Sequence, residues 1–142
     1  MPKIGINITT GSLQKPEMIV GIDLGTTNSL VALVHPDTKQ PIVLKDVSGY
    51  SLVPSIIHFG DQGQITVGEA ARPYLETEPA RTLFSVKRLM GKSYQDLNSL
   101  KDSVGYNVID QDAEALVKVE IDGKYYTPIE LSAEILKELK YR

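Results

Sequence analysis

Two short apolar runs separated by a polar turn are the most distinctive pattern in this chain. Residues 18–22 and 30–34 contain no charged side chain, and each has the length and composition of a buried strand. The turn between them, residues 23–29, is D-L-G-T-T-N-S. This layout predicts an antiparallel hairpin with residues 23–29 at its tip. Gly25 would be the point of closest backbone approach, because glycine has no side chain to keep another group away.

The next apolar segments predict further strands. Residues 41–45 begin with a proline, which lacks a backbone N–H group and is therefore typical of an edge strand. Residues 53–59 form an apolar run, and the turn-forming residues 60–63 separate it from residues 64–67. These two runs are expected to pair as a second hairpin.

Two helical segments are predicted after this hairpin. Helical character begins near Glu69, with Ala70, Ala71 and Tyr74 on one face, and Pro79 ends it. Residues 82–90 carry apolar side chains at 83, 84, 86, 89 and 90. That spacing predicts a short amphipathic helix closed by the glycine at position 91.

The last third of the chain combines a hairpin with a helix. Residues 115–121 alternate, and the D-G pair at 122–123 is a strong signal for a hairpin with residues 124–127. Thr127, Pro128 and Glu130 have the spacing of a capping box, which predicts a helix start. No glycine or proline closes this helix, so it is expected to be cut at the end of the chain. Apolar residues recur at spacing four along it: Leu131, Ile135 and Leu139.

Composition excludes several classes of protein. A chain of 142 residues with 42% apolar residues is long enough for one domain with its own core. A net charge of −3 argues against a nucleic-acid partner, which requires a basic face. Because there is no cysteine, the chain has no disulfide, thiol nucleophile or zinc–thiolate site, which fits a reducing compartment. Without a long apolar run or a signal-peptide pattern, a cytoplasmic protein with no membrane partner is expected.

The polar turn has the chemistry of a phosphate site. Gly25 allows a ligand to approach the backbone, and Thr26, Thr27 and Asn28 offer hydroxyl, amide and N–H donors for phosphate oxygens. Asp23 is a hard oxygen donor suited to Mg²⁺, directly or through water, and a cation there would offset its repulsion of phosphate. The turn matches neither a Walker A loop nor a Rossmann G-x-G-x-x-G motif. On composition alone, a tight loop rich in turn formers explains these residues equally well.

Residues 21–29, G-I-D-L-G-T-T-N-S, resemble the first phosphate loop of the actin-like ATPase superfamily, in the form found in the 70 kDa heat-shock chaperones of the DnaK type. Helix residues 131–136 also fit that family, and Val53 stands where many of its members have threonine. Three motifs follow in the family's order: V-P-S-I-I-H-F at 53–59, V-G-E-A-A at 67–71 and T-L-F-S-V-K-R-L-M-G at 82–91.

The resemblance covers residues 18–142 and implies an α/β fold of the actin-like ATPase (ribonuclease H-like) type. These residues would be the N-terminal part of lobe I of a nucleotide-binding domain, a mixed β-sheet with hairpins and a few helices, preceded by an extension, residues 1–17. A longer parent protein would supply the second phosphate loop, the adenosine pocket and the peptide-binding domain. The 142-residue chain alone is therefore expected to be inactive. It would either self-associate through uncovered apolar strands and the uncovered face of its last helix, or form a compact hairpin-rich subdomain with a mobile end.

The resemblance also implies a function and ligands. ATP hydrolysis with ATP or ADP and Mg²⁺ as cofactors would drive the binding of client peptides, stimulated by a J-domain co-chaperone. Lys87 and its neighbour Arg88 would ordinarily be solvated side chains. In the family, however, the lysine of K-R-L-x-G lies near the γ-phosphate and the attacking water, so the resemblance implies that Lys87 is catalytic. His35 and His58 are expected to be surface or partly packed residues.

Several functions remain open at this level. S-V-K-R-L-M-G at 85–91, together with the N-terminal extension, is similar to the specialised chaperones of iron–sulfur cluster assembly, which implies an iron–sulfur scaffold protein as client. A general protein-folding chaperone of the DnaK type is the alternative within the family. A sugar-kinase-type member of the superfamily also carries D-x-G-T-T, and a binding module without catalysis is a further alternative.

Overall fold

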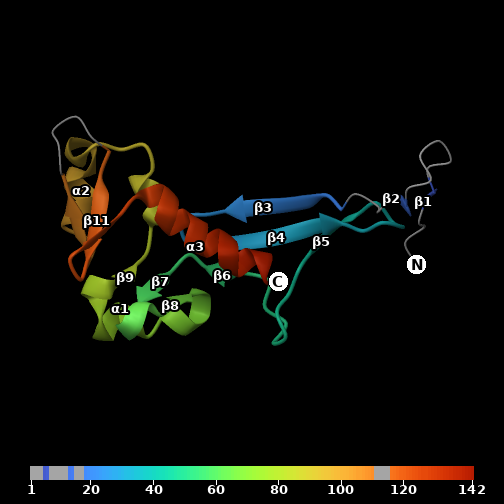
Figure 1. Ribbon diagram of the computed structural model, residues 1–142, viewed down its shortest axis with the longest axis horizontal. Coiled ribbons are helices and arrows are strands. Elements are labelled where there is room, and N and C mark those ends of the chain that lie inside the picture. The colour runs from blue at the N-terminus through green and yellow to red at the C-terminus, as the bar shows by residue number, and fades with distance from the viewer. Residues whose placement is uncertain (1–4, 7–12, 15–17, 111–115) are drawn as a thin grey trace.

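The computed structural model describes residues 5–6, 13–14, 18–110 and 116–142, which form small antiparallel sheets joined by short helices (Figure 1). The strands are β1 (Gly5–Ile6), β2 (Leu13–Gln14), β3 (Val20–Leu24), β4 (Asn28–Val34), β5 (Pro41–Val43), β6 (Val53–Pro54), β7 (Ile57–Phe59), β8 (Ile65–Val67), β9 (Thr82–Leu83), β10 (Asn107–Ile109), β11 (Lys118–Ile121) and β12 (Lys124–Tyr126). The α-helices are α1 (Tyr74–Thr77), α2 (Asn98–Lys101) and α3 (Pro128–Lys140). The 3₁₀ turns are η1 (Asp61–Gly63), η2 (Gly68–Ala71), η3 (Pro79–Arg81), η4 (Val86–Leu89) and η5 (Tyr94–Leu97).

The predicted first hairpin is present as β3 and β4, but its tip is shorter than expected. The antiparallel ladder continues to the pair Leu24–Ser29, so Asp23 and Asn28 belong to the strands and the loop is reduced to residues 25–27. The prediction placed all of residues 23–29 in the tip because their side chains are polar. Backbone pairing decides where a strand ends, and a polar side chain does not stop it.

Strand β4 joins segments that are distant in sequence. β5 pairs with its far end, Ala32 opposite Val43, and forms the edge of the sheet, as its initial proline predicted. β6 pairs with the near end of β4, beside the hairpin tip, with Asn28 opposite Pro54. The predicted single strand 53–59 is therefore wrong: β6 belongs to the β4 sheet, whereas β7 belongs to another.

The second predicted hairpin, β7–β8, is confirmed, with Ile57 opposite Val67. The helix predicted for residues 82–90 is wrong. Its first residues form β9, which pairs with β7, and only Val86–Leu89 turns, as η4. Leu83, Val86 and Leu89 are all buried, and their spacing of three fits a strand followed by a 3₁₀ turn as well as an α-helix.

The helical segment predicted near Glu69 is interrupted. It consists of η2, α1 and η3, each three or four residues long. Pro79 begins η3 rather than ending the helical region, because a proline at the first helical position loses no intrahelical hydrogen bond.

A three-stranded sheet of β10, β11 and β12 lies in the last third of the chain. Its hairpin turns at Asp122 and Gly123, both with positive φ (50° and 76°), as the D-G pair predicted. Position 115, where that strand was expected to begin, lies outside the described residues. The elements β10, η5 and α2 were not predicted from the sequence.

Helix α3 begins at the predicted capping box. Thr127 N–H donates to Glu130 Oε2 (2.8 Å), and Glu130 N–H donates to Thr127 Oγ1 (3.2 Å). The backbone hydrogen bond from Thr127 holds the pKa of the Glu130 carboxyl below its ordinary value. The expectation that the apolar face of this helix would be uncovered is wrong, because the helix packs onto the body of the molecule. Its face is buried, with 0%, 2% and 2% exposure at Leu131, Ile135 and Leu139.

The core positions the hairpin tip. The main apolar cluster lies among β7, β9, β11, η4 and α3, and Leu24 at the end of β3 packs against it. A second cluster joins Val31 and Val53 to Leu139 of α3. β3 and β4 therefore run as an arm that points its tip into the body, with the short strands β1 and β2 beyond the opposite end of the arm (Figure 1).

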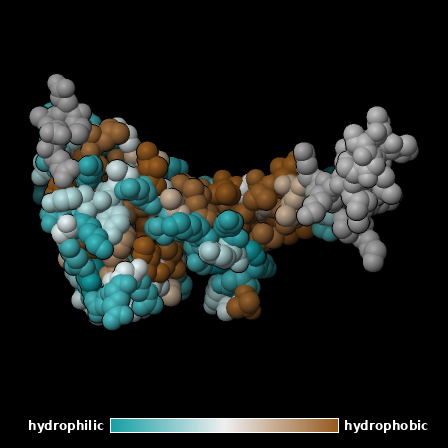
Figure 2. Space-filling view, viewed as in Figure 1, coloured by the Kyte–Doolittle hydropathy of each residue, from teal (hydrophilic) through white to brown (hydrophobic). Residues whose placement is uncertain are grey.

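The arm exposes apolar side chains. Met18, Ile19 and Ile22 are 68%, 67% and 53% exposed, and apolar atoms cover much of the arm in Figure 2. β3 lies at an edge of its sheet, so its outer backbone groups are also available for pairing. No helix in the described part of the chain is long and apolar enough to cross a membrane.

We expect the 142-residue chain to form oligomers in solution through this arm, because an exposed apolar edge strand favours pairing with a second copy. Light scattering should show a mass above that of one chain, and Ile22→Lys should shift the population toward monomer. Lys45→Glu, which changes an exposed polar position beyond β5, serves as the control. A wild-type chain that stays monomeric at every concentration would contradict this expectation.

Candidate functional site

Two buried serines support the tip of the β3–β4 hairpin. Gly25 N–H donates to Ser29 Oγ (3.2 Å), and Ser29 Oγ lies 2.9 Å from Ser55 Oγ. Ser55 Oγ donates to the carbonyl oxygen of Gly25 (2.9 Å), and Ser55 N–H donates to that of Thr27 (2.8 Å). The tip is therefore tied to the segment between β6 and β7 instead of standing free in solvent.

Position 25 accepts only glycine. A Cβ atom there would lie 2.1 Å from the carbonyl oxygen of Asn28, far inside any van der Waals contact. The close approach predicted for Gly25 is thus present, but within the hairpin itself, between the two ends of its loop.

The tip borders a surface cleft of about 190 Å³, to which Thr26 and Thr27 contribute. The backbone N–H groups of these two threonines have no acceptor among the residues that the structure describes, so both remain available as donors. The rest of the cleft is formed by Pro54, Ser55, Ile56, Arg72, Leu75, Phe84 and Ser85. Two motifs that are separate in sequence, at 53–59 and 82–91, therefore meet at the hairpin tip.

The arginine in this cleft already has a partner. Arg72 Nε and Nη2 donate to the two carboxylate oxygens of Glu69, at 2.8 and 3.0 Å. The hydrogen bond from Arg72 holds the pKa of the Glu69 carboxyl below its ordinary value. Arg72 therefore does not add an uncompensated charge beside the tip.

Asp23 lies in β3, opposite Leu30, and its side chain is exposed. Within the described residues, no group of three or more histidine, aspartate or glutamate side chains is arranged to hold a metal ion. A single exposed carboxylate fits Mg²⁺ that takes most of its ligands from phosphate and water, as this ion commonly does. The donors at the tip fit the predicted phosphate ligand. Without that phosphate, the described residues offer too few ligands to hold Mg²⁺.

Lys87 lies in η4 and is exposed. Ser85, in the cleft, adopts a left-handed φ of 56° that turns the chain into η4. Lys87 itself does not border the cleft, and it makes no ion pair with any residue that the structure describes. The structure thus brings Gly25, Thr26 and Thr27 together at the tip. Lys87 follows the cleft residue Ser85 by two positions in the chain and does not line the cleft.

His58 differs from the expectation of a surface or partly packed residue. It is 3% exposed, its Nδ1 lies 3.1 Å from Thr82 Oγ1, and its ring stacks on Tyr74 with centroids 3.8 Å apart. The ring is a structural link between β7 and α1. His35, in contrast, is partly exposed and accepts hydrogen bonds from the turn that follows it, as expected.

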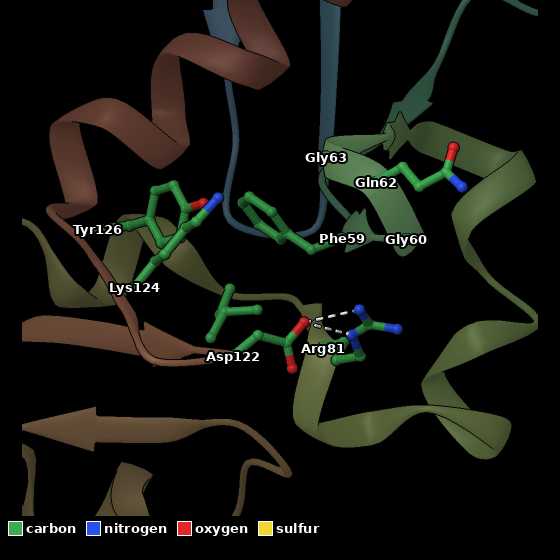
Figure 3. Close-up of a pocket in the computed structure, with 9 residues that line it drawn as sticks. Phe59, Gly60, Gln62, Gly63, Arg81, Asp122, Lys124 and Tyr126 are labelled. Carbon is green, nitrogen blue, oxygen red and sulfur yellow. Dashed lines mark hydrogen bonds and ion pairs between the residues drawn. The ribbon is translucent and has the colours of Figure 1, made fainter.

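A larger cleft, of about 310 Å³, lies between the β7–β8 and β11–β12 turns (Figure 3). Arg81 projects into it and is bound by Asp122 (2.6 Å) and by Asp61 (3.0 Å). The charge of this arginine is compensated by the two carboxylates, and Lys124 also lines the cleft.

Ser55 was not predicted as a site residue, although a serine inside the otherwise apolar run V-P-S-I-I-H-F is itself a signal. A polar side chain buried among apolar neighbours needs a hydrogen-bond partner, and here the partner is the hairpin tip.

Comparison with protein families identifies the chain's relatives. The family model described as Hsp70 protein matches residues 19–142, which include nearly all the residues that the structure describes. Members of this family are ATP-dependent chaperones with an actin-like ATPase fold; they bind ATP or ADP with Mg²⁺ and work with J-domain co-chaperones and client proteins. The predicted fold class is thereby confirmed, and the chain belongs to the Hsp70 family.

Proposed function

We propose that this chain supplies the first phosphate-binding side of the ATPase site of a molecular chaperone. The observation that supports this most directly is the hairpin tip, where available N–H groups of Thr26 and Thr27 stand on a loop held by buried serines. On this proposal, residues 18–142 are the N-terminal part of a nucleotide-binding domain, residues 1–17 precede it, and a longer parent protein completes the site.

Each predicted site residue has a role in this proposal. Gly25, Thr26, Thr27 and Asn28 surround the phosphate oxygens with backbone and side-chain donors. Asp23 orients water molecules of the Mg²⁺ shell, and the bound ion would neutralise phosphate charge. Lys87 provides a positive charge to the γ-phosphate and the attacking water, a role for which its ammonium group is free of carboxylate partners in the described part of the chain.

The chaperone branch is also part of the proposal. The segment S-V-K-R-L-M-G supports a role in iron–sulfur cluster assembly in the cytoplasm, with a J-domain co-chaperone and an iron–sulfur scaffold protein as client. Stimulation of the parent's ATPase by a scaffold protein, and not by unfolded polypeptide, would support this branch. The reverse result would favour a general DnaK-type chaperone. Phosphorylation of a sugar would favour the kinase alternative, and nucleotide binding without turnover would favour a binding module.

Thr26→Ala and Thr27→Ala in the parent protein test the phosphate site. Each removes the side-chain hydroxyl and keeps the backbone N–H, and should weaken the binding of ATP and ADP about tenfold and leave adenosine binding unchanged, because a lost hydrogen bond to a charged group costs about 1.5 kcal/mol at the lower end of its usual range. Calorimetry with the three ligands measures this difference. Thr77→Ala, at an exposed threonine in α1, is the matched control. An equal loss of affinity for all three ligands would show that the loop had collapsed and would count against the proposed contacts.

A further inference from the structure

Ser29 and Ser55 close a ring of hydrogen bonds that starts and ends at Gly25. The ring links Gly25 N–H, Ser29 Oγ, Ser55 Oγ and the Gly25 carbonyl oxygen, with distances of 3.2, 2.9 and 2.9 Å. Both serines are almost completely buried, at 1% and 2% exposure, so water does not compete for these groups.

The direction of every bond in this ring follows from counting hydrogens. A serine hydroxyl has one hydrogen. Ser55 donates its hydrogen to the Gly25 carbonyl, so the hydrogen between the two serines belongs to Ser29. Ser29 in turn accepts the Gly25 N–H. All donors therefore follow one direction around the ring, an arrangement in which each bond polarises the next.

The ring also fixes the direction of a backbone N–H group that lies outside it, that of Thr26. A trans peptide group is planar, and its C=O and N–H bonds point in opposite directions. The structure has no cis peptide bond among its described residues. Because Ser55 holds the Gly25 carbonyl toward itself, the N–H of Thr26, which belongs to the same peptide group, points away from the serines. That N–H has no acceptor in the described part of the chain.

We propose that Ser55, acting with Ser29, is a positioning residue that aims the Thr26 N–H at a phosphate oxygen of the nucleotide; this rests on the function proposed above. Without the ring, the peptide group after Gly25 would be free to rotate, because glycine tolerates more backbone conformations than any other residue. A donor that is already aimed before the ligand arrives binds more tightly than one that must be ordered on binding.

The Thr27 carbonyl strengthens this assignment. It accepts the backbone N–H of Ser55 at 2.8 Å, so the tip is held at two carbonyl groups, one on each side of Thr26. A change of the Ser55 side chain removes the first contact and leaves the second. Ser55→Ala should therefore release the Gly25–Thr26 peptide group without detaching the whole tip.

The test compares Ser55→Ala, Ser29→Ala and the double variant in the parent protein, with calorimetry of ATP, ADP and adenosine. Each single variant should bind ATP and ADP about tenfold more weakly, as expected for one lost or misdirected hydrogen bond, with adenosine unchanged. The double variant should be no weaker than either single one, because the first substitution already opens the ring. Ser132→Ala is the matched control: this buried serine donates to the Pro128 carbonyl (2.8 Å) inside α3.

Unchanged ATP affinity in both single variants would overturn the assignment, as would additive losses in the double variant. An equal loss for adenosine would show a general structural role and would overturn it as well. If Ser55→Ala does not fold, the ATP affinity of Ser29→Ala tests the assignment. That substitution opens the same ring, because it removes the acceptor of the Gly25 N–H and the hydrogen bond to Ser55. A wild-type parent that binds ATP no better than adenosine would instead refute the proposed function itself, so the two failures are distinguishable.

Discussion

Lys87→Ala in the parent protein should lower the rate of ATP hydrolysis roughly 30- to 1,000-fold while ATP affinity changes about twofold or less. A cation that acts mainly on charge developing in the transition state contributes about 2–4 kcal/mol to the barrier and little to ground-state binding. The side chain is exposed and has no carboxylate partner among the described residues, so its removal leaves no buried group unpaired. Single-turnover hydrolysis together with calorimetry measures both quantities.

Lys92→Ala provides the matched control for this experiment, because Lys92 is another exposed lysine, five residues later in the chain. Its removal should change neither the rate nor the affinity. If Lys87→Ala hydrolyses ATP at the wild-type rate in a single turnover, Lys87 is an ordinary solvated lysine and the role implied by the resemblance is wrong. A parallel fall in rate and affinity would make it a binding residue instead of a catalytic one.

Gly25→Ala should have the largest effect on nucleotide binding. The new Cβ would lie 2.1 Å from the Asn28 carbonyl oxygen, so the two ends of the loop would have to separate. Such overpacking costs about 1–3 kcal/mol, and the movement would also pull Gly25 away from both serines. We expect ATP binding about 10- to 100-fold weaker, measured by calorimetry on the parent protein.

Gly21→Ala is the control for this substitution. Gly21 lies in β3 four residues earlier, and the nearest contact to a Cβ placed there is the Ala32 carbonyl oxygen at 4.0 Å, an ordinary distance. This variant should bind ATP as the wild type does. Wild-type ATP affinity in Gly25→Ala would mean that the tip has room that the structure does not show, and the proposed phosphate contacts would lose their geometric basis.

Local patterns were sufficient to predict the elements whose partners are close in sequence. The β3–β4 hairpin, the β7–β8 hairpin and the D-G turn at 122–123 each pair segments a few residues apart, so alternation and turn residues determine them. The start of α3 was predictable for the same reason, since Thr127 and Glu130 satisfy each other's backbone groups within one turn.

Predictions failed where a distant partner decides the conformation. Thr82 and Leu83 form a strand because β7 offers an edge to pair with, although their apolar spacing suits a helix. The run 53–59 divides between two sheets because its first half meets β4 and its second half meets β8 and β9. A periodic pattern reports which face of a segment is buried, and it carries no information about the edge to which the segment bonds.

The hairpin tip proposed to bind phosphate shows the same division within one site. Its residue types, Gly25 with Thr26, Thr27 and Asn28, are a property of the sequence by itself, because hydroxyl, amide and N–H donors beside a glycine suit a close anion. The loop's orientation is a property of the tertiary structure. Ser55, 30 residues after Gly25, holds the glycine carbonyl and so directs the next N–H outward. That contact exists only once β6 has paired with β4, since the hydrogen bond spans segments that no local pattern connects.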